Sequence, residues 1–166
     1  ASPYAVFTVT GTAGQTVSLG LTAGTGTGGG TDFGSATATT NLQYSIDGGA
    51  NWLDYSTTGA FALPAGGSVL VRTPINNDAT PDNNEAFTLT ATPAGGQAAT
   101  GTGTIKDDGT GDIYKADGTT DTSAVKNDDR ALAVTSPTVN EASPYAVFTV
   151  TGTAGQTVSL GLTAGT

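Results

Sequence analysis

The sequence contains no cysteine, histidine or methionine, and only 5 of its 166 residues are lysine or arginine. Without cysteine it forms no disulfide. Without cysteine and histidine it has neither thiolate nor imidazole metal ligands, and it also lacks the general base of the common nucleophilic triads. Paired-carboxylate glycosidase chemistry needs a cleft, which nothing in the sequence places. We therefore expect a protein that is not an enzyme. Any metal site would use hard oxygen ligands, which favour Ca²⁺ over Zn²⁺.

Acidic residues dominate the charge, with 14 aspartates and glutamates and a formal net charge of −9. Nucleic acid phosphates would be repelled, so we expect no nucleic acid partner and predict cations instead. No apolar run approaches the roughly 18 residues of a membrane span, so we expect no direct membrane insertion. Because methionine and an apolar leader are both missing, we expect Ala1 not to be a native translation start and the targeting signals to lie elsewhere.

The most informative feature is an internal repeat. Residues 1–25, ASPYAVFTVTGTAGQTVSLGLTAGT, recur letter for letter at residues 142–166, an offset of 141 residues. Near-identical modules in tandem are typical of spacers and extended binding surfaces. The sequence therefore predicts one module and the beginning of the next.

Alternation of apolar and polar residues predicts an all-β protein. No segment shows a helical period, and a DGG turn at residues 47–49 leads into a short return through Trp52. Short strands at regular spacing indicate an antiparallel β-sandwich. The expected strands are residues 5–10, 15–22, 35–46, 68–73, 87–92 and 100–106.

Composition divides the chain into three parts: a sandwich at residues 1–108, an acidic connector at 109–130, and the first strands of the next, identical module at 131–166. The connector's composition predicts a flexible, self-repelling segment. Residues 131–141, ALAVTSPTVNE, resemble a first strand, which the module starting at Ala1 lacks. We expect its open sheet edge to be filled by this segment, from another copy or from the same chain folded back. Neighbouring identical modules, arranged end to end, are thus the expected partners.

Many acidic residues fall in predicted loops, where oxygen ligands can converge on an ion. Ca²⁺ takes six to eight such ligands, and nearby asparagine carbonyls are neutral donors. An acidic loop that only solvates the surface fits the spacing equally well, since no EF-hand pattern is present. The acidic loop residues are Asp78, Asp82 and Glu85 in INNDATPDNNEAF and Asp107 and Asp108 in IKDDG, and the neutral donors are Asn76, Asn77, Asn83 and Asn84.

A family resemblance rests on these same motifs. The order VNE (139–141), GTDFG (30–34), FALPAGGSVLVRTPINNDATPDNNEAFTL (61–89) and TGTIKDD (102–108) resembles the Calx-beta family as found in extender repeats of bacterial RTX adhesins. The resemblance implies an immunoglobulin-like sandwich that binds Ca²⁺ at one end. The implied ligands are Asp32, Asp78, Asp82, Glu85, Asp107 and Asp108, with Glu141 serving the following module, and a second set of candidates in the connector is Asp112, Asp117, Asp121, Asp128 and Asp129.

The function that follows from the resemblance is mechanical. We expect a non-catalytic extender module of a very large secreted adhesin on the bacterial cell surface, stiffened by Ca²⁺. The alternative is a lectin-like repeat that binds glycans through a Ca²⁺-supported surface and gains avidity from many copies. An exposed aromatic platform beside the metal would distinguish the two.

Two shorter motifs favour structural interpretations. SIDGGANW at residues 45–52 is similar to the Asp-box of sialidase propellers, SxDxGxTW, with asparagine for threonine. One copy is best explained as a hairpin turn, because a sialidase needs several arginines and the sequence has only Arg72 and Arg130. GGGTDF at residues 28–33 is faintly similar to the calcium-binding RTX nonapeptide, but a single copy predicts a loop with one aspartate ligand.

Overall fold

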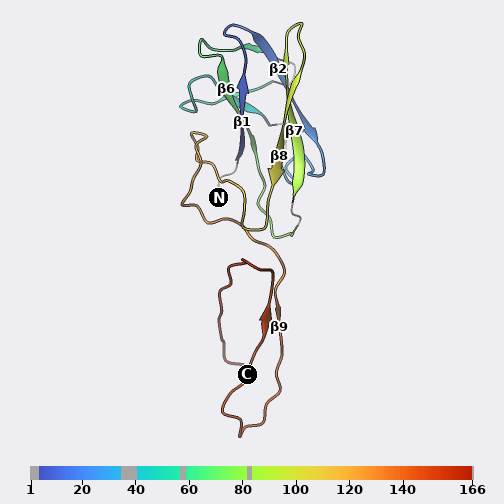
Figure 1. Ribbon diagram of the computed structural model, residues 1–166, viewed down its shortest axis with the longest axis vertical. Helices are drawn as coiled ribbons and strands as arrows, with labels where there is room; N and C mark the ends of the chain where they lie inside the picture. The colour runs from blue at the N-terminus through green and yellow to red at the C-terminus, as the bar shows by residue number, and fades with distance from the viewer. Residues whose placement is uncertain (1–3, 35–40, 57–58, 82–83, 166) are drawn as a thin grey trace.

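The computed structural model describes residues 4–34, 41–56, 59–81 and 84–165, which form an antiparallel β-sandwich followed by a connector and a short two-stranded hairpin (Figure 1). The strands are β1 (Tyr4–Thr10), β2 (Thr16–Ala23), β3 (Gln43–Ser45), β4 (Leu53–Asp54), β5 (Phe61–Ala62), β6 (Ser68–Pro74), β7 (Glu85–Pro93), β8 (Ala99–Ile105), β9 (Ala133–Val134) and β10 (Val150–Thr151).

In the part of the chain that the structure describes, two four-stranded sheets make up the sandwich. One has the order β1-β6-β3-β4 and the other β5-β2-β7-β8, with every pair antiparallel. The prediction of an all-β antiparallel sandwich is therefore confirmed. In the described part of the chain, no helix is long and apolar enough to cross a membrane.

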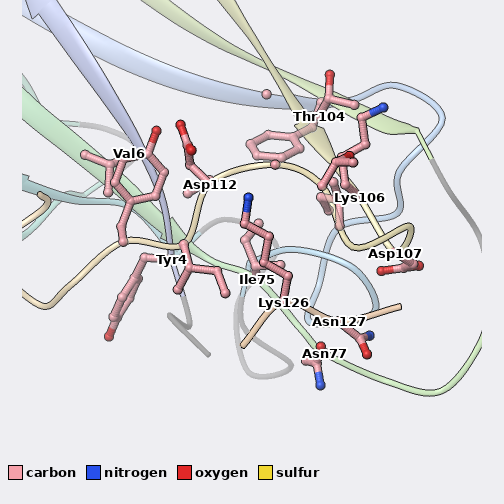
Figure 2. A pocket seen from close by; sticks show the side chains of 18 of the residues that line it. Tyr4, Val6, Ile75, Asn77, Thr104, Lys106, Asp107, Asp112, Lys126 and Asn127 are labelled. Atoms are coloured by element: carbon pink, nitrogen blue, oxygen red, sulfur yellow. The ribbon is translucent and has the colours of Figure 1, made fainter. Parts of the chain in front are cut away.

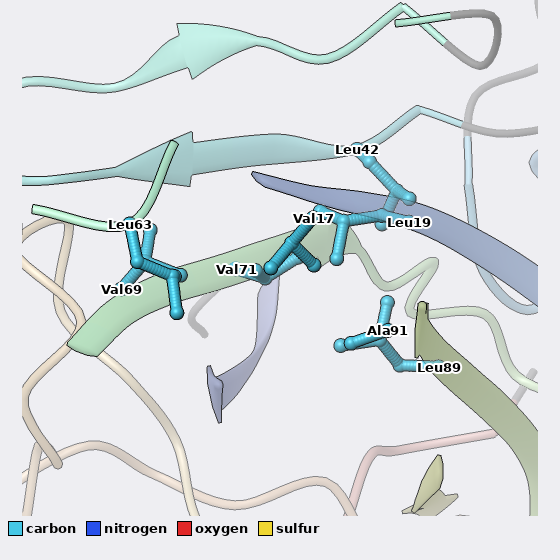
Figure 3. Close-up of a cluster of buried hydrophobic side chains, with 8 residues drawn as sticks. All are labelled: Val17, Leu19, Leu42, Leu63, Val69, Val71, Leu89 and Ala91. Atoms are coloured by element: carbon cyan, nitrogen blue, oxygen red, sulfur yellow. The ribbon is translucent and has the colours of Figure 1, made fainter. Parts of the chain in front are cut away.

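The core lies between the two sheets and explains why the strands alternate. On β6, Val69 and Val71 are buried, while Leu70 and Arg72, which alternate with them, are not, as expected when successive side chains point to opposite faces. The opposite sheet contributes Leu19 and its neighbours to the same cluster (Figure 3). The buried set is Val17, Leu19, Leu42, Leu63, Val69, Val71, Leu89 and Ala91.

Aromatic side chains close both ends of this core. Phe87 stacks on Phe33 with ring centroids 4.5 Å apart and meets Phe7 edge to face at 5.8 Å. At the other end Tyr44 stacks on Phe61 at 4.3 Å. The Phe33 backbone also bridges Ile75, just beyond β6, so the GTDFG loop is fixed to the end of the first sheet.

The predicted strands are largely present, with three differences. Of the expected strand at residues 35–46, residues 35–40 lie outside the described part, and the strand that is described is Gln43–Ser45. The short strand Phe61–Ala62 was not predicted. Within residues 131–141 only Ala133–Val134 is extended in a sheet.

The repeated block at residues 142–166 does not reproduce the fold of its first copy. It contributes β10, which pairs with β9 from the segment before it to form a hairpin below the sandwich (Figure 1). The segment at 131–141 does not fold back onto β1 of its own chain. Leu19 is 5% exposed, whereas its counterpart Leu160 is 81% exposed. Local turn chemistry is kept: Gln15 and Gln156 each accept a hydrogen bond at the side-chain oxygen from the backbone three residues earlier.

Candidate functional site

Four of the predicted calcium ligands line one small cavity at the end of the sandwich. The cavity measures about 10 Å³, which is close to the lower limit for holding a single water molecule. It lies where the GTDFG loop, the loop after β6, the start of β7 and the end of β8 meet. Its lining consists of Asp32, Asn76, Asp78, Glu85, Ile105 and Asp107.

Asp32 is firmly held at this cavity. Its residue is only 6% exposed, and its Oδ2 accepts the Thr27 N–H at 2.5 Å. The Asp32 carbonyl accepts the Asn76 N–H at 2.9 Å, and the Asn76 side-chain amide donates to the Thr31 carbonyl at 2.8 Å. These bonds fix the loop against the chain that leaves β6. Asp32 is thus held at the cavity by its backbone as well as by its side chain.

The other three carboxylates come from different strand ends. Asp78 Oδ1 accepts the Thr80 N–H at 2.7 Å, which shapes the loop after β6. Glu85 is the first residue of β7, and Asp107 follows β8 with its carbonyl accepting the Asp129 N–H at 3.0 Å. Strand ends that meet at one edge therefore gather residues that are distant in the sequence.

Carboxylates and an amide are the donor types that Ca²⁺ takes, so the residue types around this cavity fit the ion. Their arrangement is not a finished metal site, because among the described residues no three acidic side chains converge closely enough to hold a metal. Asp82 and Asn83 lie outside the described residues. Asn84, at a φ of 66°, has its side-chain oxygen bonded by the Lys106 ammonium group.

Asp108 and Glu141 do not line this cavity. The Asp108 side chain accepts hydrogen bonds from the Thr110 N–H, at 3.0 Å, and from the Thr110 hydroxyl, and the hydroxyl bond is the main reason that the pKa of Asp108 is lowered. Glu141 lies in the turn where the Ser143 N–H donates to the Asn140 carbonyl at 2.9 Å.

The connector aspartates mostly serve local turns. An aspartate oxygen accepts from the backbone N–H two residues on, and in two cases from the hydroxyl of that residue, at 2.7 Å for both Thr119 and Ser123. These hydroxyl bonds are the leading cause of the lowered pKa of Asp117 and Asp121. The remaining connector candidates are Asp128, paired with Arg130 at 2.7 Å, Asp129, which accepts from the Asn127 amide, and Asp112, which lines a second cavity described below.

The SIDGGANW segment forms a hydrogen-bonded turn between β3 and β4, in agreement with its structural interpretation. Asp47 accepts from the Ser45 hydroxyl at 2.8 Å and from the Asn51 side chain and backbone at 2.7 and 2.9 Å. Led by the Asn51 side-chain bond, these contacts lower the pKa of Asp47 to about 2. The Gly49 N–H completes the turn by donating to the buried Ser45 hydroxyl at 2.8 Å.

This turn also holds the connector, which the sequence did not predict. The Ala116 carbonyl accepts the Trp52 indole N–H and an Arg72 N–H, each at 2.9 Å. The Arg72 guanidinium lies 4.0 Å from the ring centroids of both Tyr4 and Trp52. A Cβ added to Gly49 would lie 1.8 Å from the Asp117 carbonyl oxygen, so the connector backbone touches the turn directly. Composition predicts a flexible connector, whereas the structure attaches it to the sandwich.

A larger cavity of about 340 Å³ lies between β1 and β8, the two end strands on this side of the sandwich. Figure 2 shows Tyr4 and Val6 at one side, Thr104 and Lys106 at the other, and connector residues near its mouth. The connector contributes Asp112, Lys126 and Asn127 to the lining. Its mixed charges and apolar floor suit no single small anion or cation.

Comparison with protein-family models, curated proteins and solved structures finds no match for this chain.

Proposed function

We propose that this protein is a non-catalytic extender module of a large secreted bacterial surface adhesin, built on an immunoglobulin-like sandwich of the Calx-beta type. The observation that carries the proposal is the letter-for-letter return of residues 1–25 at 142–166, after a connector that is tied to the sandwich through Ala116. Because the connector is attached to the sandwich, the chain leaves the module in a defined direction. Such modules set the length and stiffness of a stalk.

Calcium is the proposed stiffening element. Asp32, Asp78, Glu85 and Asp107 line one cavity, and Asp107 is also hydrogen-bonded through its carbonyl to the connector at Asp129. An ion held there would neutralise like charges and join the end of the sandwich to the connector. Closing the cavity around an ion requires the side chains to move inward from their present positions.

Thermal unfolding of the full chain in Ca²⁺ and in chelator tests the site. Saturation at about 100 times Kd stabilises a folded protein by about 2.7 kcal/mol, which for a chain of this size raises Tm by about 5–11 °C. Mg²⁺ should give much less, because it requires a rigid octahedral site and retains its water.

Matched variants localise the effect. Asp32→Asn removes one charge from the cavity and keeps an oxygen that can accept the Thr27 N–H, so it should abolish most of the Ca²⁺ response. Asp121→Asn makes the same change in a connector turn and should leave the response intact. A Tm that is identical in Ca²⁺ and chelator, or equal loss in both variants, contradicts the calcium assignment.

The stalk itself is tested with several modules in series. Small-angle scattering should show a longer, more rod-like particle in Ca²⁺ than in chelator, and equal extension in both would leave the ion without a stiffening role. The structure gives the glycan-binding alternative no open aromatic platform at Trp52, whose ring face lies under Arg72 and whose N–H is bonded to Ala116.

A further inference from the structure

The connector returns to the point where it leaves the sandwich. The Asp129 N–H donates to the Asp107 carbonyl at 3.0 Å, and the Gly109 N–H donates to the Asn127 carbonyl at 2.8 Å. Asp107 comes two residues after the last residue of β8, so both bonds lie at that end of the strand. Figure 1 shows the chain leaving β8, passing beside β1 and coming back before it continues to β9. The connector is therefore a closed loop, and its two hydrogen-bonded ends form its base.

The base is a short antiparallel ladder that contains an acidic pair. Asp108 and Asp128 stand opposite each other in a bridge between the two hydrogen bonds. Like charges at such positions repel each other. Arg130 offsets this repulsion, because its guanidinium donates to both oxygens of Asp128, at 2.8 and 2.7 Å, and its charge also attracts Asp108. Arg130 thus holds two carboxylates together at the base.

The far end of the loop is held by the sandwich. The Lys115 N–H donates to the Thr119 carbonyl at 2.7 Å, which closes a tight turn. The Ala116 carbonyl in this turn accepts the hydrogen bonds from Trp52 and Arg72. The loop is therefore closed at its base by its own backbone and attached at its tip to the outer face of the first sheet.

We propose that the connector is a store of chain length that opens under tension. Asp107 and Asp129 are 22 positions apart in the sequence, and a fully extended segment of that size spans about 70–80 Å. While the base is closed, the same segment adds only about 5 Å, the spacing of neighbouring strands, to the path of the chain. Release of base and tip therefore lengthens the chain by about 70 Å. The use of this length in a stalk rests on the proposed function, whereas the opening itself does not.

Tension along the chain reaches the base before it can disrupt the sandwich. The chain enters the base from β8 and leaves it toward β9, so a pull on these two ends separates the two antiparallel segments from their open end and breaks their bonds one after another. A pull along β8 instead loads its seven register pairs with β7 together. The connector should therefore open while the sandwich is still folded.

Single-molecule stretching of the full chain tests the proposal. Two short peptide tags carry the handles, one inserted between Gly95 and Gly96 in the turn from β7 to β8 and one after Ala131. The measurement is made in chelator, so that it does not depend on calcium. We expect a gain of about 70 Å, in one or two steps because base and tip can open separately, that is recovered on relaxation. Six glycines inserted after Gly118 should increase the gain by about 20 Å, because the whole loop is released.

A disulfide across the base is the matched control. Asp108 and Asp128 form a non-hydrogen-bonded antiparallel pair, for which the Cα separation of about 4.5 Å is within the disulfide range, and the chain has no cysteine of its own. In the double variant Asp108→Cys with Asp128→Cys, oxidation should abolish the gain and reductant should restore it. A pair that does not oxidise, a gain that persists after oxidation, or a sandwich that unfolds before any gain overturns the proposal.

Removal of the arginine tests how the base is held. Arg130→Gln leaves two carboxylates opposite each other, so the base should open at a lower force than in the unmodified chain. Lys115→Gln removes the same charge from an exposed position in the tip and should leave that force unchanged. Equal opening forces in the two variants overturn the role of Arg130. A gain in length without a Ca²⁺ effect on Tm contradicts the calcium assignment alone, and a Ca²⁺ effect without a gain contradicts the length store alone.

Discussion

Gly103 on β8 should not tolerate even a methyl group. A Cβ added there would lie 2.6 Å from Phe87 Cζ, 2.9 Å from Phe87 Cε1 and 3.0 Å from Phe7 Cζ. Phe87 cannot move away easily, because it is 1% exposed and stacked on Phe33. Overpacking of this kind costs about 1–3 kcal/mol, partly offset by the roughly 0.5–1 kcal/mol that alanine gains over glycine in a strand. Gly103→Ala should therefore lower the free energy of unfolding by about 0.5–2 kcal/mol.

Two other glycines provide matched controls for the same substitution. A Cβ on Gly101, two residues earlier on β8, would meet Phe7 at 3.5 Å, an ordinary contact distance, and one on Gly20 in β2 would meet nothing within 4 Å. Gly101→Ala and Gly20→Ala should be neutral or stabilising, by up to about 1 kcal/mol.

Urea unfolding followed by the fluorescence of Trp52, the only tryptophan, measures all three variants. The midpoint should fall for Gly103→Ala alone, with unchanged slope, since a changed slope would indicate an altered denatured or native ensemble. If Gly103→Ala unfolds at the same urea concentration as Gly101→Ala, or at a higher one, the packing of Phe7 and Phe87 against β8 is wrong.

Three further predictions concern the turn and the connector. Arg72→Lys should lose the planar fork that stacks on two rings, lower stability by about 1–2 kcal/mol and speed proteolysis of the connector, which digestion with a protease that does not cleave at lysine would show. Gly49→Ala should release the connector, because the added methyl group would collide with the Asp117 carbonyl. Gly48→Ala is the control: Gly48 also has a positive φ, but a Cβ there meets open space, so the variant should suffer backbone strain without releasing the connector. Similar rates of connector digestion in the two variants would count against the docking. The pKa of Asp47 is about 2 in the folded protein, against 3.8 ordinarily, so the stability that Asp47 contributes is present above pH about 4 and is lost as the pH falls toward 2. Asp47→Asn should therefore make the free energy of unfolding depend less on pH between about 4 and 2. An unchanged pH profile would refute the role of the turn.

Much of the sandwich could be predicted from alternation alone. The long strands β1, β2, β6, β7 and β8 were expected within two residues of their bounds. The first four direct every second side chain toward the core, and β8 alternates threonine with glycine. The two-residue strand Phe61–Ala62 could not be, since it is defined by pairing with β2, more than 40 residues earlier. Pattern shows which face is buried, but it does not show which distant backbone lies alongside.

The same limit applies to the candidate site. Asp32, Asp78, Glu85 and Asp107 line one cavity, because all four sit at strand ends or loops on one side. Their role as calcium ligands stays a prediction. Asp108 does not, since adjacent residues of an extended chain point in opposite directions.

The connector's attachment at Ala116 depends on long-range contacts from Trp52 and Arg72 that leave no local pattern. The turns of the connector, in contrast, have a local sequence pattern. At Asp117 and Asp121 an aspartate stands two residues before a threonine or serine, which is typical of a side-chain-capped turn.

Residues 1–25 and 142–166 are identical in sequence, so side-chain contacts alone cannot make a β-strand edge prefer one copy over the other. Which of two identical segments pairs with a given strand edge then depends on their distance along the chain, because that distance sets their effective concentration at the edge. Because the connector is held to its own sandwich at Ala116, the tether between that anchor and residues 131–141 is shorter than the sequence suggests. A short tether concentrates the sites that it can reach and excludes the rest. The length of the tether would therefore decide which copies pair with each other, and the contacts between the strands would supply only the affinity.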